Sequence, residues 1–139
     1  MSTGDGSTGP GRWIFSIGSR APIEIRLAGW LLVAGGLLFV LVDVLWSATD
    51  GGGGAFLVSV LQLVIAIGVT GGLLRGMRSA RIVGLLFALT VAFLHILIAL
   101  QSLPVWVRIV AGAIAVSQVY VAVLLNTRPA LEHTGGVRR

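Results

Sequence analysis

The chain has 139 residues, of which 56% are hydrophobic and only 11% charged, and its mean hydropathy is +1.00. Soluble domains contain about twice that share of charged residues, so a water-soluble globule of this size could not hide so much apolar surface. The net charge is +5, all ten basic residues are arginines that flank apolar runs, and there is no cysteine, which argues against nucleic acid as a partner and excludes disulfides, thiolate metal sites and iron–sulfur clusters.

The first 26 residues divide into two segments. Residues 1–11 are rich in Gly, Ser and Thr and predict a disordered tail. Residues 12–26 include the run Trp13–Ile17, in which aromatic and aliphatic side chains follow Arg12. This mixture favours the headgroup layer, so we expect the segment to lie along the membrane surface.

Four apolar runs follow, each long enough at about 1.5 Å per residue to cross a hydrocarbon core of about 30 Å. Short links join them, among them the flexible run Gly51–Gly54, so successive helices should be antiparallel neighbours. We therefore predict an all-α membrane protein, a four-transmembrane-helix antiparallel bundle over residues 27–125, followed by a second tail at 126–139. The expected spans are residues 27–47, 56–74, 82–100 and 105–125.

The arginines predict the orientation of the bundle. Nine of the ten fall on one side of such a topology, and Arg108 alone falls on the other. Basic residues in short flanking segments are retained in the cytoplasm, so both termini should be cytoplasmic in a multi-pass protein of the cell (inner) membrane. Arg75, Arg78 and Arg81 in the second link set this topology and could also hold anionic lipid headgroups.

Small residues at helical spacing mark candidate helix-packing or partner faces, because they let helix backbones approach closely in lipid. The first span carries Gly29 and Gly36, seven residues apart. We expect the small faces of the second and third spans to touch and some of the others to dock on a partner. The candidate positions are Gly68, Gly72, Gly76, Gly84, Ala88, Ala92, Ala113 and Ser117.

Ionisable side chains at membrane depth are costly and form a functional-site hypothesis. Asp43, Gln62, His95 and Arg108 fall in one layer, on the side away from the termini. The structural interpretation is an ion pair between Asp43 and Arg108 that fixes the order of the helices. The functional alternative is a proton-coupled site made of Asp43 and His95.

Enzymatic interpretations find little support in the residues. The two histidines, His95 and His133, fall on opposite sides of the membrane, so they cannot share a metal or a haem. No serine has a His and acid partner at workable spacing, and Gly51–Gly54 lacks the Lys and helix of a phosphate loop. We expect no catalytic residue and no cofactor.

The segment Gly71–Arg81 resembles a link found in a loosely related set of small actinobacterial four-span membrane proteins, in which a Gly-Leu-Leu-Arg-Gly-x-Arg-x-Ala-Arg-like sequence precedes the third span. The likeness extends to all four spans in layout but to this link alone in residues, so it implies the fold and carries over no functional residue. In size and topology the chain is also similar to small accessory subunits of multisubunit actinobacterial machines, including MCE-type lipid importers and respiratory supercomplexes.

These observations predict a non-catalytic accessory or stabilising subunit of a larger membrane complex. A transporter, and in particular lipid transport, is the expected setting, with a polytopic permease or another membrane subunit as the partner in the bilayer. The alternative is a small proton-coupled efflux carrier that acts as a homo-oligomer.

Overall fold

The computed structural model describes residues 21–50 and 56–135, so the Trp13–Ile17 segment and the Gly51–Gly54 run lie outside the described residues. Four of the helices in this part of the chain are long and apolar enough to cross a membrane, which confirms the predicted all-α four-span architecture. They are followed by a single short helix. In chain order the elements are α2 (Ile23–Asp50), α3 (Phe56–Leu74), α4 (Arg78–Leu100), α5 (Val105–Leu125) and α6 (Arg128–His133).

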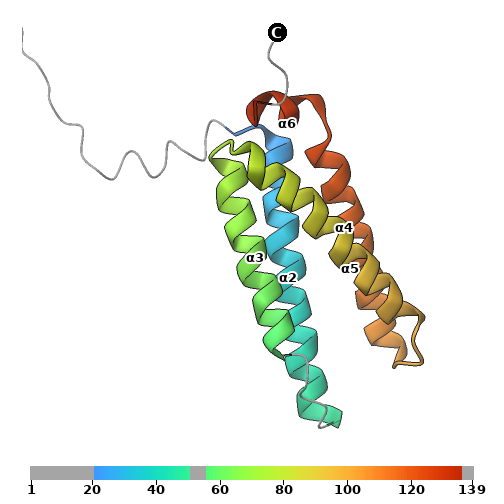
Figure 1. The fold of residues 1–139 in the computed structure, drawn as a ribbon. Coiled ribbons are helices and arrows are strands. Elements are labelled where there is room, and N and C mark those ends of the chain that lie inside the picture. The colour runs from blue at the N-terminus through green and yellow to red at the C-terminus, as the bar shows by residue number, and fades with distance from the viewer. Residues whose placement is uncertain (1–20, 51–55, 136–139) are drawn as a thin grey trace, which may run out of the picture.

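The four long helices form two antiparallel hairpins, α2/α3 and α4/α5, joined into one bundle (Figure 1). Helix α2 packs on α3 and α5, and α4 packs on α3 and α5. The hairpins lie together where α2 begins and α6 crosses the bundle, and they diverge toward the α4–α5 link (Figure 1). We call these the terminal end and the far end of the bundle.

Two helices extend beyond the apolar runs that predicted them. Helix α2 begins at Ile23, where the N–H groups of Ile25 and Arg26 each bond to the carbonyl of Pro22 at 3.1 Å. Helix α4 begins at Arg78, four residues before the predicted span at residue 82. The reason is general: hydropathy marks where a helix enters hydrocarbon, while backbone hydrogen bonding continues into the interface.

The α3–α4 link is a tight turn at Gly76. The Gly76 N–H bonds to the Leu73 carbonyl and the Met77 N–H bonds to the Gly72 carbonyl, both at 3.0 Å, and Gly76 has φ +72°. This is the Schellman arrangement that ends helices at a left-handed glycine. Gly76 therefore terminates α3, which corrects its assignment to a helix-packing face.

The apolar core lies at the terminal end. Ile25, Leu32, Leu73 and Leu125 are each exposed by no more than 1%, and Ala130 of α6 packs among them with no exposure. Helix α6 therefore closes this end of the bundle, within the segment predicted as a tail. Pro129 in its first turn suits a helix start.

The predicted contact between α3 and α4 is present near their link. A methyl group placed on Gly72 would lie 2.6 Å from Cβ of Ala80, and one on Gly84 would lie 2.9 Å from Cγ1 of Val69. Ala88 and Ala92 continue this buried face of α4, with exposures of 0% and 3%.

The candidate small residues Gly68, Ala113 and Ser117 lie outside the contact between α3 and α4. Gly68 is exposed, and a methyl group on it would meet nothing within 4 Å, so it faces away from α4. The physical reason is that α3 uses Ala66, Val69 and Leu73 as its inward positions. On α5, Ala113 is exposed, while the half-buried Ser117 donates to the carbonyl of Ile114 at 2.7 Å.

Glycines of α2 make the closest approach in the α2/α3 hairpin. A methyl group on Gly29 would lie 2.6 Å from Cγ2 of Thr70, whose hydroxyl donates to the Gly29 carbonyl at 3.3 Å. A methyl group on Gly36 would lie 3.2 Å from the Cα of Leu63. These two glycines, seven residues apart, therefore line the contact of α2 with α3, a pairing of faces that the spacing alone did not predict.

Candidate polar site in the bundle interior

The buried carboxylate of Asp43 meets one hydroxyl from the neighbouring helix. Asp43 is 8% exposed on α2, and the hydroxyl of Ser59, fully buried in the first turn of α3, donates to its Oδ2 at 2.9 Å. The same hydroxyl lies 2.9 Å from the carbonyl of Phe56. Ser47, one turn further along α2, donates to the backbone carbonyl of Asp43 at 2.8 Å.

Ser59 can satisfy Asp43 in either protonation state. Toward an ionised carboxylate, the single hydroxyl proton goes to Oδ2, the stronger acceptor. Toward a protonated carboxyl group, the Ser59 oxygen can accept that proton while its own proton goes to the Phe56 carbonyl. The Ser59 hydroxyl can therefore act either as a donor or as an acceptor toward the Asp43 side chain.

His95 is buried on α4 with one ring nitrogen engaged. Its exposure is 2%, and Nδ1 lies 2.8 Å from the carbonyl of Val91. Because a carbonyl can only accept, Nδ1 carries a proton. Nε2 is buried without a hydrogen-bond partner, and the ring meets Phe39 of α2 edge-on with centroids 4.8 Å apart.

Gln118 is the buried amide on α5. Its exposure is 1%, and its Oε1 has no hydrogen-bond partner. Its Nε2 lies 2.7 Å from the position that a methyl group on Gly35 would take. The amide therefore occupies the space that the absent side chain of Gly35 leaves on α2.

These polar groups form a row along the bundle interior. Gln118 meets α2 at Gly35, His95 meets it at Phe39, and Ser59 meets it at Asp43. Those three positions of α2 are successive turns of one face, about 12 Å from first to last. We call Gln118, His95, Asp43 and Ser59 the polar row; Gln62, buried one turn after Ser59 on α3, shares its helix face.

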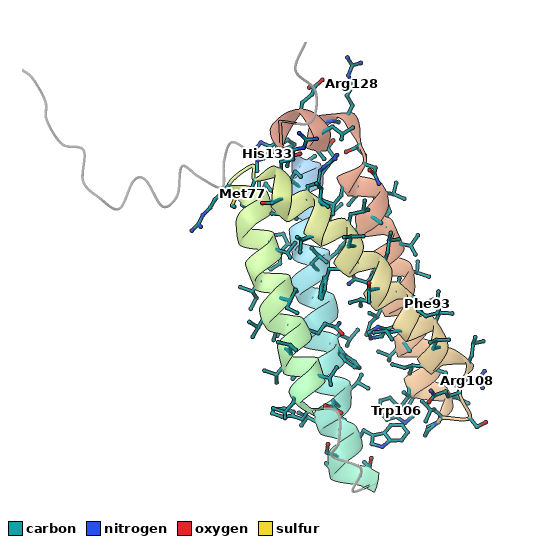
Figure 2. All side chains as sticks on the ribbon, in the orientation of Figure 1. Met77, Phe93, Trp106, Arg108, Arg128 and His133 are labelled. Atoms are coloured by element: carbon teal, nitrogen blue, oxygen red, sulfur yellow. The ribbon has the colours of Figure 1, made fainter. Side chains whose placement is uncertain are left out.

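Arg108 does not join the polar row, and its predicted ion pair with Asp43 is not formed. Arg108 is exposed in the first turn of α5, and its Nε donates to the carbonyl of Ala99 at 2.9 Å. Figure 2 shows its side chain at the outer edge of the far end. Ala99 is in the last turn of α4, where carbonyls lack helical partners, so the guanidinium caps α4 across the short link.

Two tryptophans meet at the far end, and this pair was not predicted. Trp46 of α2 and Trp106 of α5 have ring centroids 6.3 Å apart at an angle of 42°. Trp106 reaches from α5 toward α2 where the hairpins diverge (Figure 2). The pair therefore connects the two hairpins beyond the polar row, at a depth where tryptophan favours the membrane interface.

An apolar groove lies on the outer face of α4 and α5. Its volume is about 350 Å³. Ala115 is 4% exposed and forms part of its floor, and Gly112 has nothing within 4 Å of the place where a methyl group would be. The groove is lined by Ile96, Ala99 and Leu100 of α4 and by Gly112, Ala115, Val116 and Val119 of α5.

Fold and site together define a small all-α protein with four helices long and apolar enough to cross a membrane, an apolar core at the terminal end and a buried polar row that runs from the middle of the bundle toward the far end. No family model, no curated protein and no solved structure matches this chain.

Proposed function

We propose that the protein is a non-catalytic accessory subunit that stabilises a larger membrane complex, with a transporter, and lipid transport in particular, as its setting. The outer groove on α4 and α5 is the observation that carries this proposal. Its floor of small residues lets another backbone come close, which is how helices associate in lipid, where burying apolar surface alone gives little driving force. The occupant we propose is one apolar transmembrane helix of a polytopic partner subunit.

The proposed orientation has both termini in the cytoplasm. The terminal end carries Arg26, Arg75, Arg78, Arg81 and Arg128, whereas the described arginine of the far end is Arg108. The positive-inside rule counts such residues in short segments next to membrane spans. The outer groove then lies in the half of the bundle away from the cytoplasm.

Co-purification from the native host tests the accessory function. The tagged protein, extracted in a gentle detergent, should bring down a stoichiometric polytopic subunit identified by mass spectrometry. Gly112→Leu should place a larger side chain in the groove and lower recovery of that subunit at least about tenfold while the bundle stays folded, because the Cβ that it adds has no atom within 4 Å.

Gly68→Leu is the matched control, since a Cβ added at this exposed glycine of α3 also has no atom within 4 Å. It should leave recovery of the partner unchanged. Loss of the partner in Gly68→Leu with retention in Gly112→Leu would assign docking to α3 instead of the groove. Recovery of the protein only with lipid, or only with copies of itself, would contradict the accessory function.

The polar row favours a second candidate, a small proton-coupled carrier that works as a homo-oligomer. The observations that favour it are the buried Asp43 carboxylate with its Ser59 partner and the ring nitrogen Nε2 of His95, which has no partner among the described residues and lies one turn along α2, at Phe39. Protein reconstituted alone would then export a lipophilic cation against a proton gradient. Asp43→Asn should abolish that export, while Arg108→Gln, which changes a charge outside the row, should preserve it.

A further inference from the structure

Buried nitrogen atoms without acceptors gather at the terminal end of the bundle. Nε and Nη1 of Arg81 are buried and find no hydrogen-bond partner among residues 21–50 and 56–135. The same holds for Nε2 of His133, at the end of α6. Arg81 as a residue is half-buried, and burial of these two donor atoms without an acceptor is unfavourable, so they favour an anion as their partner.

Arg81 lies next to the start of α4. It occupies the first turn beyond the N-cap residue Met77, and its own N–H bonds to the Met77 carbonyl at 3.3 Å. Helical side chains lean back toward the N-terminus, which directs the guanidinium toward the opening turn. No side chain caps this turn, so amide groups of a 23-residue helix remain available at its positive end.

His133 is held against the α3–α4 link, just before that turn. A methyl group on Gly76 would lie 2.9 Å from the His133 carbonyl and 3.5 Å from its Nε2. Figure 2 shows His133 beside Met77, where α6 meets the α3–α4 link. The His133 side chain therefore lies beside the link from which α4 begins.

Among the described residues, no acid pairs with Arg81: Glu24 in the first turn of α2, at this same end, forms no ion pair with it. Arg75 and Arg78 are exposed and add positive charge, while the carboxylate of Glu132 pairs with Arg128 at 3.2 Å on the exposed side of α6. The apolar core begins directly inside, with Leu73 and Leu125 buried. The site thus lies at the end of the apolar helices, between exposed arginines and the apolar core.

We propose that Arg81, His133 and the opening turn of α4 bind a phosphate group. A guanidinium presents a planar pair of donors that matches phosphate oxygens, and an uncapped helix start adds amide donors and a favourable dipole. The phosphate can come from an anionic lipid headgroup or from free inorganic phosphate. This site is independent of the outer groove and of any partner subunit.

Binding to the purified full-length protein in a neutral detergent tests the proposal. The probes are dioctanoyl phosphatidic acid, dioctanoylglycerol with the same chains and no phosphate, and inorganic phosphate. We expect the phosphatidic acid to bind, the glyceride to bind at least about tenfold more weakly, and Arg81→Gln to lower affinity for the phosphatidic acid by about tenfold or more. Binding of inorganic phosphate without binding of the lipid would assign the site to free phosphate.

Arg128→Gln is the control, because Arg128 is exposed and already engaged with Glu132. It should change affinity by less than about twofold. Should Arg81→Gln fail to fold, Arg81→Lys and His133→Ala take its place, and each should weaken phosphatidic acid binding at least about threefold. Equal losses in the Arg81 and Arg128 variants, unchanged affinity in the Arg81 variants, or equal binding of the two lipids would overturn the proposal.

Discussion

The hydrogen bond between Ser59 and Asp43 joins the side chains of two spans, α3 and α2, in the bundle interior. Replacing Ser59 with Ala removes the donor at 2.9 Å and leaves a buried carboxylate without its partner. We expect Ser59→Ala to lower the free energy of unfolding by about 1–3 kcal/mol, measured by reversible unfolding in mixed detergent micelles. Ser117→Ala removes a hydroxyl that bonds only within its own helix and should cost less than about 1 kcal/mol.

Double-mutant cycles separate this bond from the ion pair suggested by the sequence. Asp43→Ala combined with Ser59→Ala should lose at least about 1 kcal/mol less than the sum of the single losses. Asp43→Ala combined with Arg108→Ala should be additive within about 0.5 kcal/mol, because Arg108 is engaged with the Ala99 carbonyl. Strong coupling in the second cycle would contradict the structure at this site.

Two glycines of α3 that look alike in the sequence should respond differently to the same change. Gly72→Ala brings a methyl group within 2.6 Å of Cβ of Ala80 and should destabilise the protein by about 1–3 kcal/mol through overpacking. Gly68→Ala meets nothing and should be neutral or stabilising by up to about 1 kcal/mol through helix propensity. The melting temperatures of the two variants in detergent test whether Gly72→Ala is the less stable of the two.

At the scale of elements, α6 is the one whose role depends most on tertiary contacts. With six residues it is too short to be stable alone, and Ala130 ties it to the core with no exposed surface. Ala130→Leu should lower stability by about 1–3 kcal/mol, because the side chain must enter a filled core. Glu132→Leu adds the same side chain at an exposed position and should change stability by less than about 1 kcal/mol, as measured by the same unfolding assay.

The spans show which element properties a sequence can predict. Helices α3 and α5 begin and end at the predicted residues, since short polar links with Gly or Pro bound their apolar runs on both sides. Both ends of α2 and the start of α4 extend into segments of mixed polarity, where hydropathy carries no signal about the backbone, whereas α4 ends at the predicted Leu100. Helix α6 lacks an apolar run altogether, so only its contact with the core reveals it.

At the scale of the whole molecule, the proposed orientation has a direct test in intact cells. The chain has no native cysteine, so single cysteines report their own position. Ser102→Cys in the exposed α4–α5 link should react with an impermeant maleimide, whereas Glu132→Cys on the exposed side of α6 should react only after permeabilisation. The reverse pattern would place both ends of the chain outside.

By itself, the sequence determined the class of the molecule: four spans, their antiparallel order and the presence of ionisable groups at membrane depth. These follow from run length, link length and composition, which are local properties. Only the tertiary structure decided which side chains meet across the helices. Spacing along one helix cannot say whether Asp43 meets Arg108 or Ser59, nor that Gln118 fits against Gly35, because each contact depends on how far one helix is shifted and rotated against another. The same reason explains why Gly72 packs on Ala80 while Gly68, one turn earlier, faces outward.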